Sequence, residues 1–198
     1  METEPRPDPK HEAAHPARHV PRRSFGERLI GAARLDAMVY EDVEADLSAT
    51  KQAVLVVCLS GVSLAIGRAN AGLEGVASSM LREMIGWLLI SGIVYIIGDK
   101  ILRGRATFGE LLRTIGFAQA PGLLAALSWY APINAPVRYG IATWKLFAVV
   151  VAIRQALDFD EGDWGTARAL LTAGLGFIVY VGLAALQAWL LGMPIIPE

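Results

Sequence analysis

Cysteine and histidine are scarce in this chain, and the few that occur lie where they offer little chemistry. Cys58 is the lone cysteine, so the chain cannot form an intrachain disulfide. The three histidines, His11, His15 and His19, all precede the apolar part of the sequence, and Pro16 interrupts the helix that would align them as metal ligands. The rest of the chain therefore lacks an imidazole, which argues against an enzyme, a metal site or another cofactor.

Excess charge and phosphate-binding motifs are lacking as well. The formal net charge is −1 and the sequence has no clustered basic face, which argues against a nucleic-acid partner. No glycine-rich loop of Walker spacing and no His-Glu-x-x-His sequence occurs. These absences exclude the commonest signatures of nucleotide hydrolysis and zinc proteolysis.

What the chain does have is long apolar runs. Hydrophobic residues make up 54% of the sequence and are concentrated after residue 50. A soluble helical bundle would need a polar face on each helix, and the last of these runs has no charged residue at all. We therefore predict an all-α integral membrane protein whose membrane domain, 49–198, has five transmembrane helices at about 52–69, 84–102, 111–130, 137–154 and 169–191.

The first 48 residues differ from the rest in composition. Residues 1–23 are rich in proline and charge, which predicts a disordered tail. Residues 24–48 show an apolar residue every three or four positions, with a basic first half and an acidic second half. This period predicts an amphipathic cytosolic helix that lies on an anionic membrane surface or packs against the protein's own cytosolic side.

The stretch from Thr107 to Pro121 begins as an amphipathic helix and enters the third apolar run. Thr107 and Glu110 have the spacing of a capping box. Pro121 lies within the run and leaves the carbonyl of Phe117 without its helical partner, a defect that a neighbouring helix must repair in lipid. Small residues four apart in the first run predict close helix approach: Gly61 with Ala65, and Ser63 with Gly67.

Lys145 lies inside the fourth run, where a charge is costly and indicates either a functional site or an internal partner. The prolines and asparagine of 131–136 predict a turn, so the third and fourth runs form an antiparallel hairpin. Our hypothesis is that the Lys145 ammonium donates to the Gln119 side-chain oxygen and to the Phe117 carbonyl freed by Pro121. The alternative is that Lys145 snorkels to the interface or is neutral.

Basic residues in the short loops predict the orientation. They are concentrated on the side of the N-terminus, which we therefore place in the cytoplasm, with the C-terminus external. The inner ends of the third and fourth runs should form a cytosolic contact surface, or a set of ordinary membrane anchors, from Arg103, Arg105, Glu110, Arg113, Arg154 and Asp158.

Four segments carry a family resemblance: the run from Val39 to Asp46, Gly86-Trp87, the run from Arg105 to Pro121, and the run from Ile153 to Phe159. Together they resemble the bacterial branch of the Yip (YPT-interacting protein) membrane family over about residues 38–191. In eukaryotes this family is associated with Rab GTPases and with vesicle traffic between endoplasmic reticulum and Golgi. The resemblance implies a five-span fold in the bacterial cytoplasmic membrane. The resemblance does not predict any chemical reaction for the protein.

These observations predict a non-enzymatic membrane adaptor or scaffold that binds a protein or lipid partner at its cytosolic face. The expected partners are membrane lipids and a membrane or cytosolic protein, or further copies of the chain. The alternative is a small transporter or channel whose polar path lies near Lys145 and Pro121, because transporters use interrupted helices for such paths.

Overall fold

A computed structural model describes residues 23–68, 72–158 and 163–190, and within these ranges the regular elements are all helices. The predicted disordered tail lies outside the described residues apart from Arg23, as do the three histidines. Five stretches in the described part are long and apolar enough to cross a membrane: Ala49–Gly67, Leu73–Ile101, Phe108–Trp129, Asn134–Ala156 and Trp164–Gly182. The predicted fold class, an all-α integral membrane protein with five transmembrane helices, is confirmed.

Each candidate span consists of one or two helical elements. The first is α3 (Ala49–Gly67), and the second is α4 (Leu73–Val94) continued by the π-helix η2 (Tyr95–Ile101). The third is α5 (Phe108–Phe117) continued by the 3-10 helix η3 (Ala120–Trp129), and a single turn, η4 (Ala131–Ile133), leads into the fourth. The last two are α6 (Asn134–Ala156) and α7 (Asp163–Leu190).

The second span is longer than its apolar run. We predicted its start at residue 84, but α4 begins at Leu73 and passes through Arg82 and Glu83 without a break. Charged residues end a hydropathy run, whereas they do not end a helix, because arginine and glutamate are both good helix formers. The span therefore includes a carboxylate that the sequence reasoning had placed outside it.

Small residues on α3 let its neighbours approach closely, as predicted. A Cβ atom on Gly61 would lie 2.7 Å from the Met80 Cα of α4. A Cβ atom on Gly67 would meet the Ala125 carbonyl of η3. Both glycines are buried, so α3 packs between α4 and η3 with its backbone against theirs.

The capping box and the helix break of the third span are both present. The Thr107 hydroxyl accepts from the Glu110 N–H at 3.3 Å, and the Glu110 carboxylate accepts from the Thr107 N–H at 2.7 Å. The α-helix α5 ends at Phe117, and the chain continues past Pro121 as η3. These two predictions are confirmed.

Ser63 of α3 repairs part of the interrupted backbone. Its hydroxyl donates to the Leu123 carbonyl at 2.6 Å and accepts from the Ala126 N–H at 2.8 Å. A hydroxyl that donates and accepts at once satisfies two backbone groups that a regular helix would pair internally. Ser63 therefore supports the third span beyond its break, but the groups it binds do not include the Phe117 carbonyl for which a partner was predicted.

The amphipathic segment forms two helices, and our prediction of one helix over 24–48 is wrong. α1 (Phe25–Ala33) and α2 (Ala37–Ala45) are separated by a turn in which Leu35 has a φ of 63°. Asp36 ends the turn, because its side chain accepts from the Met38 N–H at 3.0 Å and so begins α2 as its N-cap. Apolar periodicity cannot distinguish this break from a continuous helix.

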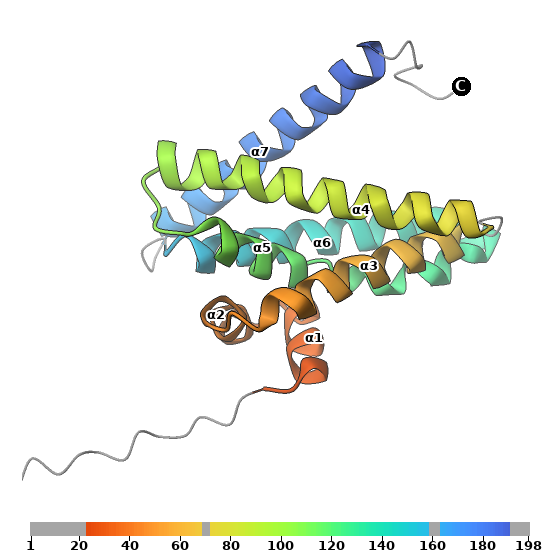
Figure 1. Ribbon diagram of the computed structural model, residues 1–198, viewed down its shortest axis with the longest axis horizontal. Helices are drawn as coiled ribbons and strands as arrows, with labels where there is room; N and C mark the ends of the chain where they lie inside the picture. The colour runs from red at the N-terminus through yellow and green to blue at the C-terminus, as the bar shows by residue number, and fades with distance from the viewer. Residues whose placement is uncertain (1–22, 69–71, 159–162, 191–198) are drawn as a thin grey trace, which may run out of the picture.

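The two short helices pack against the protein itself. The Tyr40 hydroxyl donates to the Ala32 carbonyl at 3.1 Å, which fixes α2 on α1. The Trp144 indole N–H donates to the Ala33 carbonyl at 2.7 Å, and the rings of Phe25 and Phe117 meet edge to face. Figure 1 shows both helices to one side of the bundle, near the start of α3. Of our two alternatives for this segment, the structure shows packing on the protein.

The hairpin between the third and fourth spans turns more tightly than expected. We predicted a turn over 131–136, yet α6 already begins at Asn134 and includes Pro136 in its first turn. Proline is accommodated there because the first turn of a helix has no internal partner for its N–H groups. The side chain of Asn134 donates to the Ser128 carbonyl at 2.6 Å and closes the turn.

Candidate functional site

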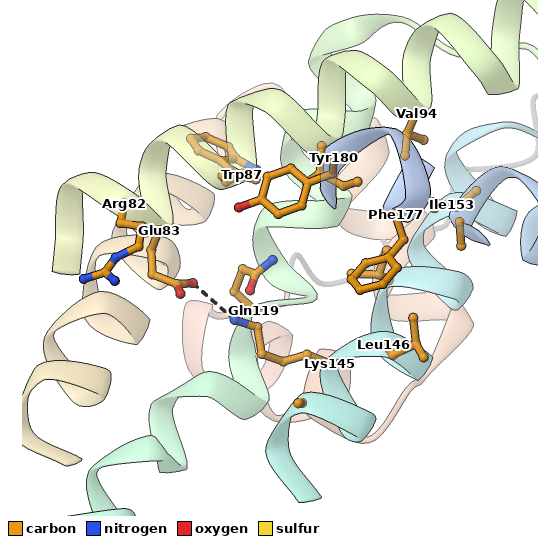
Figure 2. A pocket seen from close by; sticks show the side chains of 15 residues that line it. Arg82, Glu83, Trp87, Val94, Gln119, Lys145, Leu146, Ile153, Phe177 and Tyr180 are labelled. Carbon is orange, nitrogen blue, oxygen red and sulfur yellow. Dashed lines mark hydrogen bonds and ion pairs between the residues drawn. The ribbon is translucent and has the colours of Figure 1, made fainter. Parts of the chain in front are cut away.

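A cavity of about 330 Å³ lies between α4, α6 and α7, with the junction of α5 and η3 beside it. Figure 2 shows Glu83, Lys145 and Gln119 together at one side of this cavity and Val94, Ile153 and Phe177 at the other. The volume falls in the range of small-molecule sites in proteins. We call this space the intramembrane cavity.

Lys145 is paired with an acidic residue across the intramembrane cavity. Its Nζ atom donates to the Glu83 carboxylate at 3.2 Å, and the two side chains are 24% and 20% exposed. An ion pair of this kind lowers the cost of placing either charge within a span. Lys145 of α6 and Glu83 of α4 thereby connect the second and fourth spans.

Gln119 faces the same cavity but differs from the charged pair in having an unused acceptor. The residue is 8% exposed, and its Oε1 atom is buried without a hydrogen-bond partner among the described residues. Burial of an unsatisfied acceptor costs about 1–3 kcal/mol. Gln119 lies between the end of α5 and the start of η3, so the break of the third span places this amide at the cavity.

The predicted tie from Lys145 to Gln119 is not formed. Lys145 and Gln119 line one cavity, as expected for side chains on the two spans of a hairpin. The lysine nevertheless donates to Glu83, and the Gln119 oxygen has no partner in the described structure. A carboxylate is the stronger acceptor for an ammonium group because the hydrogen bond is assisted by opposite charge. Phe117 and Pro121 are both buried at the break of the third span.

Glu83 is the charged residue of the cavity that the sequence reasoning missed. We used it as the boundary of the second run, although it is the one acidic residue between Glu74 and Asp99. A lone carboxylate beside a predicted span, matched with a lone lysine inside another, is the signal that would have identified the pair.

The predicted cytosolic contact surface contains both exposed and buried members. The α5 and α6 ends are neighbours, since the Arg105 N–H donates to the Leu157 carbonyl at 3.0 Å. Arg103, Arg105 and Asp158 are exposed, whereas Arg154 and Glu110 are partly buried. The structure therefore brings the two predicted ends together and leaves three of the six side chains open to a partner.

Arg113 is the buried member of that set. It is 4% exposed, and its guanidinium donates to the Glu44 carbonyl of α2, with the Nε atom at 3.1 Å. This carbonyl belongs to the last turn of α2, where backbone acceptors lack helical partners. Arg113 therefore holds the C-terminal end of α2 on α5 and is not available as a contact for another protein.

Arg28 attaches α1 to the rest of the protein in a similar way. It is 1% exposed, with its Nε atom 2.8 Å from the Asp42 carboxylate and its Nη2 atom 2.8 Å from the Asp46 carboxylate. Its Nη1 atom donates to the Gln52 side chain of α3 at 3.1 Å. One guanidinium thus connects α1, the end of α2 and the first span.

The Glu44 side chain lies in an acidic environment at the same place. Burial, together with the nearby charges of Asp158 and Glu110, raises its pKa from 4.5 to about 7, and Arg113 opposes this shift only in part. Its protonation state therefore changes near neutral pH. Sequence reasoning grouped Glu44 with the other acidic residues of α2 and had no means to distinguish it.

Comparison with known proteins gives one match. A family model described as the Yip1 domain matches residues 39–186, which is more than half of the chain and runs from α2 into α7. The match includes all five candidate spans as well as the Glu83, Gln119 and Lys145 positions. No curated protein and no solved structure matches the chain.

Proposed function

This chain belongs to the Yip1 domain family of integral membrane proteins, and from that premise we propose that it is a non-enzymatic adaptor that binds a protein partner at its cytosolic face. The support is the way α1 and α2 are held. Two buried arginines, Arg28 and Arg113, fix both helices on the bundle, so the outer polar face has a defined shape before any partner arrives. Preorganisation of this kind favours specific binding.

The charges on this face favour a protein over a lipid surface. Arg103 and Arg105 are exposed beside exposed Asp158, and α2 contributes exposed Glu41. Anionic lipid headgroups attract clusters of uniformly basic residues, whereas charges of both signs suit a complementary protein surface. We refer to these four residues as the cytosolic face.

The cytosolic face is tested by recovering partners from the native membrane. The tagged protein is extracted in mild detergent, and proteins that remain bound in stoichiometric amount are identified by mass spectrometry. The double variant Arg103→Gln/Arg105→Gln should lose the partner. Arg138→Gln is the matched control, because it removes an exposed cation near the opposite end of α6. Recovery of the chain alone, or equal loss in both variants, would contradict the adaptor function.

We further propose that the face lies in the cytoplasm of a bacterial cell, with the C-terminus external. The support is the excess of basic residues at the end that carries α1 and α2. In a Cys58→Ser background, Arg105→Cys should react with a membrane-impermeant maleimide only after the cells are opened. Arg138→Cys should react in intact cells, and the reverse pattern would overturn the orientation.

A further inference from the structure

We propose that the intramembrane cavity binds one lipid molecule, whose headgroup donates a hydrogen bond to Gln119 and whose acyl chain extends toward Ile153. This site is separate from the cytosolic face and does not depend on the adaptor function. Three observations carry the proposal: an unsatisfied acceptor, the order of polarity along the cavity, and an apolar opening.

The unsatisfied acceptor indicates the kind of group that would occupy the polar side. Gln119 is more than nine-tenths buried, it lines the cavity, and its Oε1 atom has no partner in the part of the chain that the structure describes. An amide oxygen accepts hydrogen bonds and cannot donate them. The complementary group is therefore a hydroxyl or an ammonium, and a bare phosphate oxygen does not fit this position.

The wall of the cavity changes from polar to apolar in one direction. The same order holds along three helices: from Glu83 to Val94 on α4, from Lys145 to Ile153 on α6, and from Tyr180 to Ala173 on α7. Along α6, Lys145 and Ile153 are separated by about 12 Å at 1.5 Å per residue. An amphiphile whose polar group lies beside Lys145 and whose chain lies beside Ile153 has this same order.

The opening of the cavity is apolar. Leu146 of α6 is 51% exposed and Phe177 of α7 is 59% exposed, although both line the cavity. Figure 1 shows the C-terminal half of α7 leaving the bundle, so the helix that closes this side is splayed. In a protein that spans the membrane, an apolar opening at this depth meets hydrocarbon, which makes the bilayer the source of the occupant.

The charged groups at the polar side complete the match to a phospholipid. Lys145 and Glu83 are paired, yet their side chains stay 24% and 20% exposed, and Arg82 lines the same end. An ammonium and a carboxylate within reach can contact the phosphate and the donor group of one headgroup. We therefore name the ligand class as a phospholipid with a hydroxyl- or amine-bearing headgroup, such as a glycerol or ethanolamine lipid.

The first experiment measures the lipid that stays bound. The protein is purified in mild detergent, and lipids are quantified by mass spectrometry against protein. We expect about one phospholipid per chain to remain after extended washing. Gln119→Leu, which keeps the volume and removes the acceptor, should lower this retention at least tenfold. Retention that is unchanged in Gln119→Leu, or a polar solute recovered in place of lipid, would overturn the proposal.

A matched pair of tryptophan variants separates loss of the ligand from loss of the fold. Ala142 lines the cavity and is exposed, so Ala142→Trp should fill the opening and abolish retention. Gly140→Trp puts the same side chain on the same helix at a position with open space around it, and should retain lipid. Loss in both variants with intact thermal unfolding would mean that the lipid is not held in the cavity.

A spectroscopic test in nanodiscs does not rely on washing. Trp87 lines the cavity and is 5% exposed, so lipids at the outer surface of the bundle have little access to it. With the other four tryptophans replaced by phenylalanine, lipids with brominated chains should quench the fluorescence of Trp87. The quenching should fall severalfold when Ala142→Leu is added to this single-tryptophan chain, because leucine fills the opening without adding a second fluorophore. Equal quenching with the opening filled would contradict the site.

Discussion

The indole N–H of Trp144, in the middle of α6, donates a 2.7 Å hydrogen bond to the carbonyl of Ala33 at the end of α1. This carbonyl has no partner within its own helix, because the last turn of a helix leaves its acceptors free. The bond therefore satisfies a helix end and joins a peripheral helix to a membrane span in one contact.

Trp144→Phe should loosen α1. The substitution keeps an aromatic ring and removes the donor, so we expect a loss of about 1 kcal/mol in the docking of α1. Amide hydrogen exchange measured by mass spectrometry should rise in peptides that cover 25–33 and stay unchanged in α4. Trp164→Phe is the control, since Trp164 is 82% exposed. Equal exchange in the two variants would show that the indole bond does not hold α1.

The attachment of α2 should depend on pH through Glu44. Its pKa in the folded chain is about 7, above the ordinary 4.5, so the neutral form is favoured when α2 is docked. Docking is therefore most stable below pH 4.5 and weakens as the pH rises through 7. Amide exchange of α2, corrected for the intrinsic pH effect, should increase between pH 5.5 and pH 8.5.

Glu44→Gln tests the origin of that pH dependence. The amide stays neutral, so exchange of α2 should become nearly independent of pH and the unfolding temperature at pH 8.5 should rise by about 2–4 °C for each 1 kcal/mol gained. Glu74→Gln, at an exposed position in the first turn of α4, should keep the pH dependence of the parent chain. A pH dependence that survives in Glu44→Gln would assign it to another group.

Lys145 and Glu83 should behave as one unit. Lys145→Met leaves a carboxylate without its partner, and Glu83→Gln leaves an ammonium without its partner, so each change should lower stability by about 2 kcal/mol. The double variant should be less destabilised than the sum of the two single changes. A double-mutant cycle on thermal unfolding in detergent measures the coupling, and strictly additive effects would show that the pair contributes nothing.

Ser63→Ala should destabilise the 3-10 helix of the third span. The change leaves the Leu123 carbonyl and the Ala126 N–H without their partner, at a cost of about 1–3 kcal/mol. Exchange should increase over 120–129. Ser78→Ala is the matched control, because the Ser78 hydroxyl donates to the Gly75 carbonyl within its own helix and is exposed. An unchanged third span in Ser63→Ala would mean that water replaces the hydroxyl without loss.

The sequence predicted those features that depend on local chemistry. The Thr107 capping box, the break near Pro121 and the close contacts of Gly61 each follow from a residue type and its immediate neighbours. The cost of a charge in a span also identified Lys145 as a residue that requires a partner. In each case the physical requirement is present in a window of a few residues.

The features that were missed depend on which helices are neighbours in space. The partner of Lys145 was sought on the adjacent span of the hairpin, whereas Glu83 comes from α4, which no local pattern places beside α6. The division of 24–48 at Leu35 depends on Tyr40 and Ala32 packing against each other, a contact that forms only after the chain has turned. Periodicity describes one helix at a time, so it contains neither piece of information.

The attachment of α1 and α2 has a consequence for how the protein is made. These helices are synthesised before the membrane spans, yet their attachment points lie far along the chain: 69 residues separate Glu44 from Arg113, and 111 separate Ala33 from Trp144. Because synthesis proceeds at about 5–20 residues per second, α2 waits about 3–14 s for Arg113 of the third span and α1 waits about 6–22 s for Trp144 of the fourth. Docking of α1 and α2 is therefore complete only once the chain has been synthesised as far as Trp144, and a chain arrested earlier leaves the Ala33 carbonyl without its indole donor.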